Sequence, residues 1–317
     1  MDNKKMLKRF EALCKILPLR LQSAVLKMDE PTQLAAQELR LRVNRPLQIL
    51  LNGQIEFLGE RGKTTPRSNE SSIIVSSQEI FDVFRAVCGY SVHTHQSEIA
   101  DGFITFEGGH RVGICGTAVI NDGIVSGMRD ISSLNIRIAK EIRGCAEKVI
   151  KYSNYGCKGM LLAGPPSSGK TTMLRDLARL LAGDGICNIK KVALLDERGE
   201  LAAMWQGVPQ NDVGICTDIL SGYTKKKAIL MAIRTLSPDI IICDEIGRED
   251  DIDAIKTGAV CGVKLIASVH AATIDEVIKK PFVKELAALG AFDTIVLLNG
   301  CERVGEIKEV RELVNNE

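Results

Sequence analysis

The stretch GMLLAGPPSSGKTTMLRDLARLLAG (residues 159–183) decides the fold of the second half of the chain. It contains a short apolar strand, then a loop of glycine, proline and serine, and then an amphipathic helix that we expect from Met173 onward. The loop from Gly164 to Thr171 fits the pattern GxxxxGK[ST] in the strand, loop and helix context where that pattern binds phosphate. The alternative interpretation is a glycine-rich turn that matches by chance.

This loop offers the groups that a bound nucleotide needs. Its glycines allow backbone N–H groups to point inward around the β- and γ-phosphates, and the following helix N-terminus adds positive potential. Lys170 supplies a point charge, and Thr171 offers its hydroxyl to Mg²⁺. We therefore expect ATP and Mg²⁺ as ligands. The expected nucleotide-binding residues are Gly164, Pro165, Pro166, Ser167, Ser168, Gly169, Lys170, Thr171 and Thr172.

A second apolar run, SPDIIICDEIG (237–247), supplies carboxylates. The run of Ile240 to Cys243 is typical of a parallel strand covered on both faces, and Asp244 and Glu245 follow at its carboxyl end. Carboxyl ends of strands line the ligand crevice in doubly wound sheets. We expect Asp244 to hold Mg²⁺ through water and Glu245 to orient or deprotonate the attacking water. The alternative is that both acids cap a helix beginning near Asp250.

Two more apolar segments end on polar residues. KVALLDERGEL (191–201) places Asp196 and Glu197 after a strand, and KLIASVH (264–270) ends on His270. If these strands are parallel, their ends meet at one crevice, so we expect Asp196 and Glu197 to be catalytic and His270 to contact the γ-phosphate and report its loss. Histidines at strand ends are also often only hydrogen-bonded structural residues.

Basic residues have two possible interpretations each. Arg137 alternates with isoleucines on an expected strand, with Arg111 and Arg129 nearby in sequence, and it is either a catalytic contact or part of a solvated strand face. Arg234 lies near the end of the helix before the SPDIIICDEIG segment, where a cation favours the helix dipole, but it also suits a γ-phosphate or intersubunit contact.

Three consecutive lysines, Lys225 to Lys227, stand at the start of the helix KKKAILMAIRTL, where the dipole disfavours cations. Our hypothesis is that they face an acidic partner or a neighbouring subunit together with the loop 206–224. The alternative is a hydrated run of charges.

The first part of the chain has a mixed α+β pattern that names no reaction. We expect an opening helix ended by Pro18, a strand over 38–43, a hairpin at Asn52-Gly53 and a helix capped by Ser76 with Glu79. Glycine-punctuated apolar runs over 102–128 predict a small antiparallel sheet. The predicted division is 1–140 for an α+β N-terminal domain, 141–158 for a linker and first helix of the motor, and 159–317 for a P-loop ATPase domain that ends in a hairpin near Asn299-Gly300.

Composition narrows the class of protein. A chain of 317 residues with 45% hydrophobic residues is long enough for about two domains. The net charge of +1 and the aromatic content of 4% argue against stable nucleic-acid binding. Ten cysteines without a CxxC pair indicate reduced thiols in a cytoplasmic protein, with Cys243 and Cys261 expected in the core. We expect no signal peptide and no transmembrane segment.

The order of these motifs resembles the secretion traffic ATPases of type II and type IV systems. Four longer segments resemble the stage III sporulation protein AA family, and the similarity extends over nearly the whole chain. They are GYSVHTHQSEIADGFITFEGGHRVGICGTAV (89–119), RDISSLNIRIAKEI (129–142), VPQNDVGICTDIL (208–220) and IICDEIG (241–247).

The resemblance implies an α/β fold, with a RecA-like P-loop ATPase domain preceded by a smaller α+β N-terminal domain. It implies an ATPase that energises a membrane-associated channel complex during endospore formation. It also implies membrane-embedded partners, a peripheral cytoplasmic location at the membrane, a hexameric ring and an arginine such as Arg137 at the nucleotide. The chain has Asp244-Glu245 where the secretion enzymes have Gly-Glu, and Asp196-Glu197 where they have Glu-Asp. Which acid at 196 or 197 contacts the attacking water therefore stays open.

Two other functions are compatible with the same core. One is a RecA-like motor on single-stranded nucleic acid, which steep salt-dependent binding to oligonucleotides would favour. The other is a ring that binds ATP as a structural switch with little turnover, and replacing Glu245 with glutamine separates it from a motor.

Overall fold

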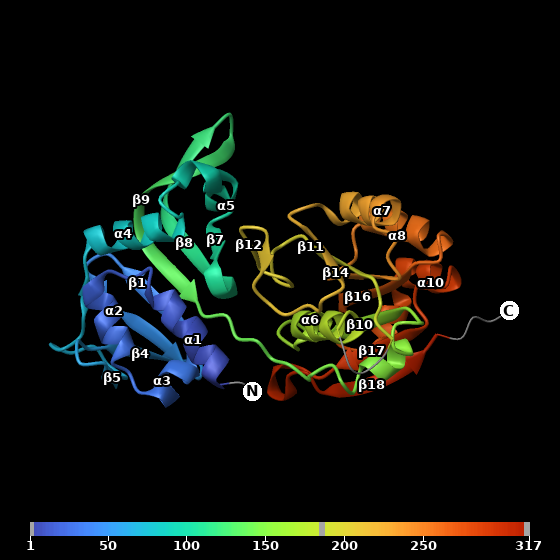
Figure 1. Cartoon of the computed structure of the whole chain (residues 1–317), viewed down its shortest axis with the longest axis horizontal. Helices are drawn as coiled ribbons and strands as arrows, with labels where there is room; N and C mark the ends of the chain where they lie inside the picture. The colour runs from blue at the N-terminus through green and yellow to red at the C-terminus, as the bar shows by residue number, and fades with distance from the viewer. Residues whose placement is uncertain (1–2, 184–187, 314–317) are drawn as a thin grey trace. The chain divides into compact units, whose positions relative to one another are not determined.

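A computed structural model describes residues 3–183 and 188–313, so Cys187 lies outside the described residues. The chain forms two compact units, Met1–Glu141 and Ile142–Glu317 (Figure 1). No helix in the described ranges is long and apolar enough to cross a membrane.

The N-terminal unit is organised around a seven-stranded antiparallel sheet among the residues described, in the order β5-β4-β3-β1-β9-β8-β7. Its strands are β1 (Ala36–Arg42), β3 (Gln48–Leu51), β4 (Gln54–Leu58), β5 (Thr64–Thr65), β7 (Phe103–Phe106), β8 (His110–Asn121) and β9 (Ile124–Arg137), beside the pair β2 (Arg45–Pro46) and β6 (Ile74–Val75). Its helices are α1 (Asn3–Cys14), α2 (Leu19–Leu26), α3 (Glu30–Ala35), α4 (Ser77–Val87) and α5 (Gln96–Ala100).

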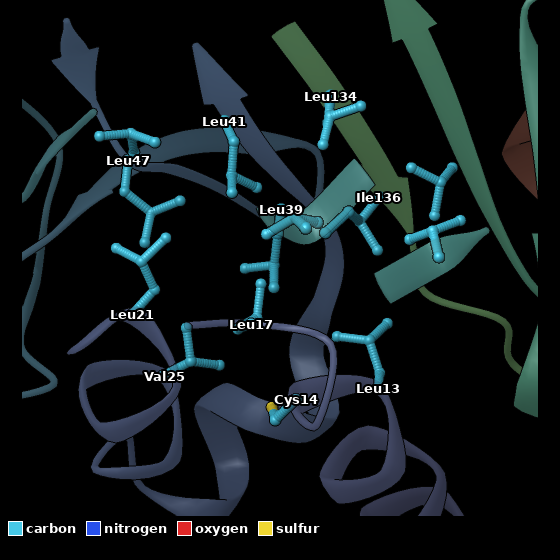
Figure 2. Packing of buried hydrophobic residues seen from close by; sticks show 14 of the residues in the cluster. Leu13, Cys14, Leu17, Leu21, Val25, Leu39, Leu41, Leu47, Leu134 and Ile136 are labelled. Atoms are coloured by element: carbon cyan, nitrogen blue, oxygen red, sulfur yellow. The ribbon is translucent and has the colours of Figure 1, made fainter. Parts of the chain in front are cut away.

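The core of this unit lies between the helices and one face of the sheet. Figure 2 shows Leu13 and Cys14 of α1, Leu21 and Val25 of α2 and the intervening Leu17 directed at strand residues. The strand side of this contact is Leu39 and Leu41 of β1, Leu134 and Ile136 of β9, and Leu47 just before β3, all at most 1% exposed. Alternating strand residues therefore bury one sheet face, as the ELRLRV pattern predicted.

The hairpin and the helix cap predicted from local sequence signals in this unit were confirmed. Asn52 and Gly53 both have positive φ and join β3 to β4, which is the geometry of the tight hairpin that an Asn-Gly pair favours. Ser76 accepts a hydrogen bond from the Glu79 backbone at 3.2 Å, and the Glu79 carboxylate accepts one from the Ser76 backbone at 2.8 Å. One expectation was wrong: the opening helix already ends at Cys14, and Pro18 instead precedes α2.

The second unit has a sheet in the order β14-β11-β15-β16-β10-β17-β18, in which only the edge strand β18 is antiparallel to its neighbour among the described strands. The strands are β10 (Met160–Gly164), β11 (Val192–Asp196), β14 (Thr217–Ser221), β15 (Ile240–Cys243), β16 (Lys264–His270), β17 (Thr294–Leu298) and β18 (Ile307–Glu312), beside the pair β12 (Met204–Trp205) and β13 (Val208–Pro209). The helices are α6 (Lys170–Leu181), α7 (Lys225–Thr235), α8 (Glu249–Val260), α9 (Ile274–Lys279) and α10 (Pro281–Ala288).

Helices cover both faces of this sheet, so its strands are buried on both sides. Residues of α6 pack with one set of alternating strand residues, such as Leu162 and Ile242. Residues of α7, α8, α9 and α10 pack with the other set, such as Leu161 and Ile241. This three-layer arrangement explains why the strands are continuous apolar runs.

Several sequence expectations for this unit were wrong. The expected first helix within 141–158 is only a 3-10 turn at Ile150–Ser153. The segment 206–224, which we expected to be a loop, contains strand β14. This strand was not predicted because the alternation of Thr217, Ile219 and Ser221 with other residues is a weak strand signal at a sheet edge. Cys243 is fully buried, but Cys261 is exposed at the end of α8. The C-terminal hairpin was confirmed, since β17 and β18 are paired across residues 299–306.

Candidate functional site

The loop between β10 and α6 has a backbone that requires small residues at defined positions. Gly169 has φ +93°, which non-glycine residues rarely adopt, and a Cβ on Gly164 would lie 2.5 Å from the Ser168 hydroxyl oxygen. Ser167 also has a positive φ of +60°. The expected nucleotide-binding residues from Gly164 to Thr172 thus form one tight turn that ends in the first turn of α6.

Lys170 is the first residue of α6, and its side chain turns back over the loop. Its ammonium donates to the carbonyl oxygens of Gly164 at 2.9 Å and Pro165 at 2.8 Å, and it lies 3.2 Å from Nδ1 of His270. Burial lowers the pKa of Lys170, while the nearby carboxylates of Asp244 and Glu245 oppose that shift. The side chains of the loop lysine and of the histidine that ends β16 are therefore in direct contact.

Asp244 joins the loop to strand β15. Its Oδ2 accepts a hydrogen bond from the Thr171 hydroxyl at 2.6 Å. Its Oδ1 accepts one from the buried hydroxyl of Ser268 and one from the Glu245 backbone at 3.0 Å. The two expected metal-side residues, Thr171 and Asp244, are in direct contact.

Glu245 is held at both carboxylate oxygens. Nε2 of His270 lies 2.8 Å from Oε1, and the guanidinium of Arg198 lies 2.7 Å from Oε2. Burial opposes ionisation of this carboxyl, but the hydrogen bond from His270 and the charge of Arg198 outweigh it, so its pKa lies below the usual range. Because the Lys170 ammonium has no lone pair, Nδ1 of His270 accepts and its Nε2–H donates to Glu245.

The two acids after β11 have different environments. Asp196 is 2% exposed, and its carboxylate accepts hydrogen bonds from the backbone amides of residues 200 to 203. Glu197 pairs with the Lys225 ammonium at 2.6 Å and lies 3.6 Å from Arg248. These bonds fix the loop after β11. Both Asp196 and Glu197 line the crevice, so the catalytic role of either acid stays a prediction.

A hollow of about 310 Å³, open to solvent, lies beside these acids. Its charged lining includes Glu197, Arg198, Lys225, Asp244 and Glu245. It joins the carboxyl ends of β11 and β15, where two of the three predicted strand-end groups meet; the third, His270, is not part of the lining but lies 2.8 Å from Glu245. The convergence expected of the strand ends is thus present in the geometry.

The structure places Arg234 away from this crevice. Helix α7 begins after the carboxyl end of β14 and leads to the amino end of β15, so its last turn lies at the opposite edge of the sheet. Arg234 is exposed there. The predicted γ-phosphate contact within the same chain is therefore wrong, because about 14 Å of helix rise separates Arg234 from Lys225, which lines the crevice.

Arg137 belongs to the N-terminal unit, on the sheet face opposite its core. It ends β9 between Glu38 of β1 and Arg111 of β8, with its guanidinium 3.8 Å from the Glu38 carboxylate and a side chain that is 65% exposed. Arg111 stacks over the Phe103 ring at 3.5 Å. Arg129 lies elsewhere, on the exposed part of the β8–β9 ribbon, so only Arg111 and Arg137 are neighbours.

The three lysines at 225–227 have different surroundings. Lys225 is 7% exposed and pairs with Glu197, while Lys226 pairs with Asp250 at 2.9 Å. The ammonium of Lys227 lies 5.4 Å from the centre of the Tyr223 ring. Only Lys225 departs from both interpretations, because the crevice carboxylate of Glu197 offsets the unfavourable dipole there; Lys226 and Lys227 are exposed, so the partner hypothesis stays a prediction for these two.

Sequence reasoning missed three residues of the site: Arg198, Lys225 and Ser268. Lys225 carried a signal, since a lysine at a helix N-terminus requires a compensating anion. Arg198 follows the two acids of DERGEL directly, and that position was the available signal. Ser268 carried none, because a serine inside an apolar strand is also typical of a plain core position.

The residues of the loop and of the strand ends beside it fit a nucleoside triphosphate with Mg²⁺. Within the described part of the chain the hydroxyl of Ser168 is buried and has no hydrogen-bond partner. A buried polar group of this kind normally has a partner, so the loop is arranged for a ligand that supplies one. The Lys170 ammonium and the Thr171–Asp244 pair are the cation and the oxygen ligands that phosphate and Mg²⁺ require.

Comparisons with known proteins agree with this fold. The family model described as "Sporulation stage III, protein AA" matches residues 7–315. Stage III sporulation protein AA of Bacillus subtilis (strain 168) is 34% identical over 307 residues, which are 96% of this chain and 95% of the relative.

Two solved structures have a similar fold. The pilus retraction motor PilT with bound ADP has a TM-score of 0.57 and 13% identity, over 83% of this chain and 74% of PilT. The Legionella pneumophila ATPase DotB has a TM-score of 0.53 and 13% identity, over 92% of this chain and 74% of DotB. The predicted RecA-like α/β fold is thereby confirmed.

Proposed function

The chain belongs to the sporulation stage III protein AA family, and we propose that it is a motor that hydrolyses ATP to ADP and phosphate. The observation that carries this proposal is the convergence of Lys170 and Thr171 with Asp244 and Glu245 at one edge of the parallel sheet. These are a phosphate-binding cation, two oxygen ligands and a carboxylate base, which is the set that phosphoryl transfer to water requires.

In this proposal the loop from Gly164 to Thr172 binds the phosphates of ATP, and the hydroxyl of Thr171, together with Asp244 through water, would hold the Mg²⁺. When bound, Mg²⁺ neutralises charge that develops on the phosphate oxygens. Lys170 exchanges its two backbone carbonyl partners for phosphate oxygens. This exchange is favourable because an ammonium bonds more strongly to an anion than to neutral carbonyls.

Glu245 orients the attacking water and accepts its proton. In the present arrangement His270 and Arg198 each engage one carboxylate oxygen, and each oxygen keeps a lone pair for water; both partners lower the basicity of Glu245, so withdrawal of one favours proton transfer. His270 is suited to this because it contacts Lys170 with its other ring nitrogen. Movement of Lys170 onto phosphate frees that nitrogen, and His270 then reports whether the γ-phosphate is present.

We further propose that Arg137 is a catalytic arginine that contacts the transferred phosphoryl group. Arg137 and Arg111 are neighbours on a sheet face with no core residues, and a positive charge placed on the transferred phosphoryl group is worth about 10³ to 10⁵ in turnover. Changes in the contacts of the phosphate-sensing residues during the cycle would give mechanical output. A hexameric ring is the proposed assembly.

The proposed role is to energise a membrane-associated channel complex during endospore formation, from the cytoplasmic face of the membrane. Family membership supports the sporulation context. The proposed partners are membrane-embedded components of that complex. A change in sedimentation mass from protomer to hexamer on addition of a non-hydrolysable ATP analogue would support the ring, and an unchanged mass would exclude a nucleotide-dependent one.

The test of the hydrolytic proposal is Glu245→Gln in the full chain. We expect the variant to bind ATP as the parent does and to lose about 10² to 10⁴ in turnover, because its amide cannot accept the proton of the water. Glu285→Gln is the matched control, since Glu285 pairs only with the surface residue Lys256 at 2.7 Å. Equal turnover of the parent and Glu245→Gln would refute the motor and favour a structural switch.

A further inference from the structure

Ser268 lies in β16 two residues before His270, and its side chain is completely buried. We propose that Ser268 is a positioning residue for the reaction: its hydroxyl orients the carboxylate of Asp244 toward the metal and fixes the turn that directs Glu245 into the crevice. This inference rests on the proposed function.

The two carboxylate oxygens of Asp244 have different hydrogen-bond partners. Ser268 donates its hydroxyl proton to Oδ1, and the backbone amide of Glu245 donates to the same oxygen. Oδ2 is left for the hydroxyl of Thr171. Because Oδ1 is occupied by two donors, the carboxylate cannot rotate freely, and the oxygen that remains for Mg²⁺ is the one beside Thr171.

Ser268 also holds the backbone that follows β15. Glu245 has φ +47°, a left-handed conformation that is unfavourable for a residue with a side chain. The Ser268 hydroxyl accepts the amide proton of Glu245 at 2.9 Å, and the Ser268 carbonyl accepts that of Ile246 at 2.9 Å. The chain leaving β15 is thus bound to Ser268 at two successive residues, which holds the unfavourable turn in place.

A buried serine elsewhere in the same unit gives the comparison that separates positioning from packing. Ser153 is also fully buried, donates to the carbonyl of Ile150 at 2.7 Å and accepts from the amide of Gly156 at 3.1 Å. Each serine therefore makes one bond as donor and at least one with a backbone amide. Only Ser268 has a crevice carboxylate as its acceptor, so only its loss changes a ligand of the metal.

The experiment measures Mg²⁺ binding without hydrolysis. Full-length parent, Ser268→Ala, Ser268→Cys and Ser153→Ala are titrated with Mg²⁺ in the presence of a fluorescent non-hydrolysable ATP analogue. We expect Ser268→Ala to raise the half-saturating Mg²⁺ concentration about 10- to 100-fold, the usual effect of removing a group that orients a metal ligand. Binding of the analogue in EDTA stays at the parental level.

Ser268→Cys fills the same space with a weak donor, so it shows the same defect in Mg²⁺ with a smaller loss of thermal stability. Ser153→Ala loses thermal stability and keeps the parental Mg²⁺ requirement. A half-saturating Mg²⁺ concentration within about twofold of the parent, in either folded Ser268 variant, overturns the assignment. Failure of the parent itself to bind the analogue would instead refute the proposed function.

Discussion

The two sheets of this protein have seven described strands each, yet their polar residues are distributed in opposite ways. In the antiparallel N-terminal sheet, strand ends alternate between the two edges, and its charged side chains form a small local cluster in which Glu38 pairs with Arg40 and Arg137. In the second sheet the parallel strands end together, and the groups that follow them form one connected network from Arg198 through Glu245 and His270 to Lys170. Strand direction alone therefore concentrates reactive groups at one edge.

Two histidines illustrate the same difference. His110 of the N-terminal unit is fully buried and bridges two backbone groups, the carbonyl of Arg9 at 3.2 Å and the amide of Ala139 at 3.1 Å. His270 is half exposed and bridges two charged side chains, Lys170 and Glu245. Residue type does not separate a structural histidine from a site histidine, but the chemical nature of its two partners does.

The largest effect that we predict concerns the ion pairs of the two units. In the second unit, Lys225→Met removes the partner of Glu197 from a pair with side chains 8% and 21% exposed, and we expect a loss of about 3–5 kcal/mol in unfolding free energy. In the N-terminal unit, Arg20→Met breaks a pair whose arginine is 45% exposed, and we expect a loss of about 1 kcal/mol or less.

Equilibrium unfolding in denaturant measures both changes. Trp205, the single tryptophan, belongs to the second unit and reports on Lys225→Met by fluorescence, while far-UV circular dichroism follows Arg20→Met. Lys226→Met is the control, because its pair with Asp250 is exposed. Similar losses for Lys225→Met and Lys226→Met would contradict a buried charge network in the crevice.

The next effect is the contribution of His110 to the pH dependence of the unfolding free energy. Burial lowers the pKa of His110 to about 4, below the ordinary value of 6.5. The folded protein thus holds the neutral ring, so its stability is complete above pH 6.5 and is lost as the pH falls toward 4, by about 3 kcal/mol.

His110→Gln removes this dependence, although it lowers stability at neutral pH. The difference in unfolding free energy between parent and His110→Gln, measured between pH 7 and pH 4, isolates the contribution of His110 from other titrating groups. A difference that does not change with pH would mean that His110 is protonated in the folded protein.

The smallest predicted effect is the loss of a helix N-cap, which we compare between one helix of each unit. Ser76 caps α4 by accepting from the Glu79 amide at 3.2 Å, and Thr273 caps α9 by accepting from the Glu276 amide at 3.2 Å. Ser76→Ala and Thr273→Ala should each cost about 1 kcal/mol in denaturant unfolding. Unequal losses, several-fold apart, would show that the units differ in more than their strand direction.

Much of the fold followed from the sequence because its signals are local. The Asn52-Gly53 turn, the Ser76 capping box and the apolar runs of the parallel strands each depend on neighbouring residues. The weak alternation of β14 and the 3-10 turn at Ile150–Ser153 escaped, because packing against distant elements decides them.

The site was predictable where a residue follows a strand end and unpredictable where a partner comes from a helix or from within a strand. Thr171, Asp244, Glu245 and His270 converge as expected. The sequence did not indicate that backbone amides four to seven residues ahead in the chain occupy the carboxylate of Asp196. The γ-phosphate contact of Arg234 within the same chain was wrong, because sequence proximity to a strand does not say which end of that strand the residue approaches.

The most direct test of the central claim is a crystal structure of the full chain with Mg²⁺ and a non-hydrolysable ATP analogue. We predict that the loop from Gly164 to Thr172 encloses the phosphates, that Mg²⁺ lies beside Thr171 and Asp244, and that Lys170 has left the carbonyls of Gly164 and Pro165 for phosphate oxygens. An analogue bound away from this loop, with the contacts of Lys170 unchanged, would contradict the claim that the carboxyl edge of the parallel sheet is the site of ATP hydrolysis.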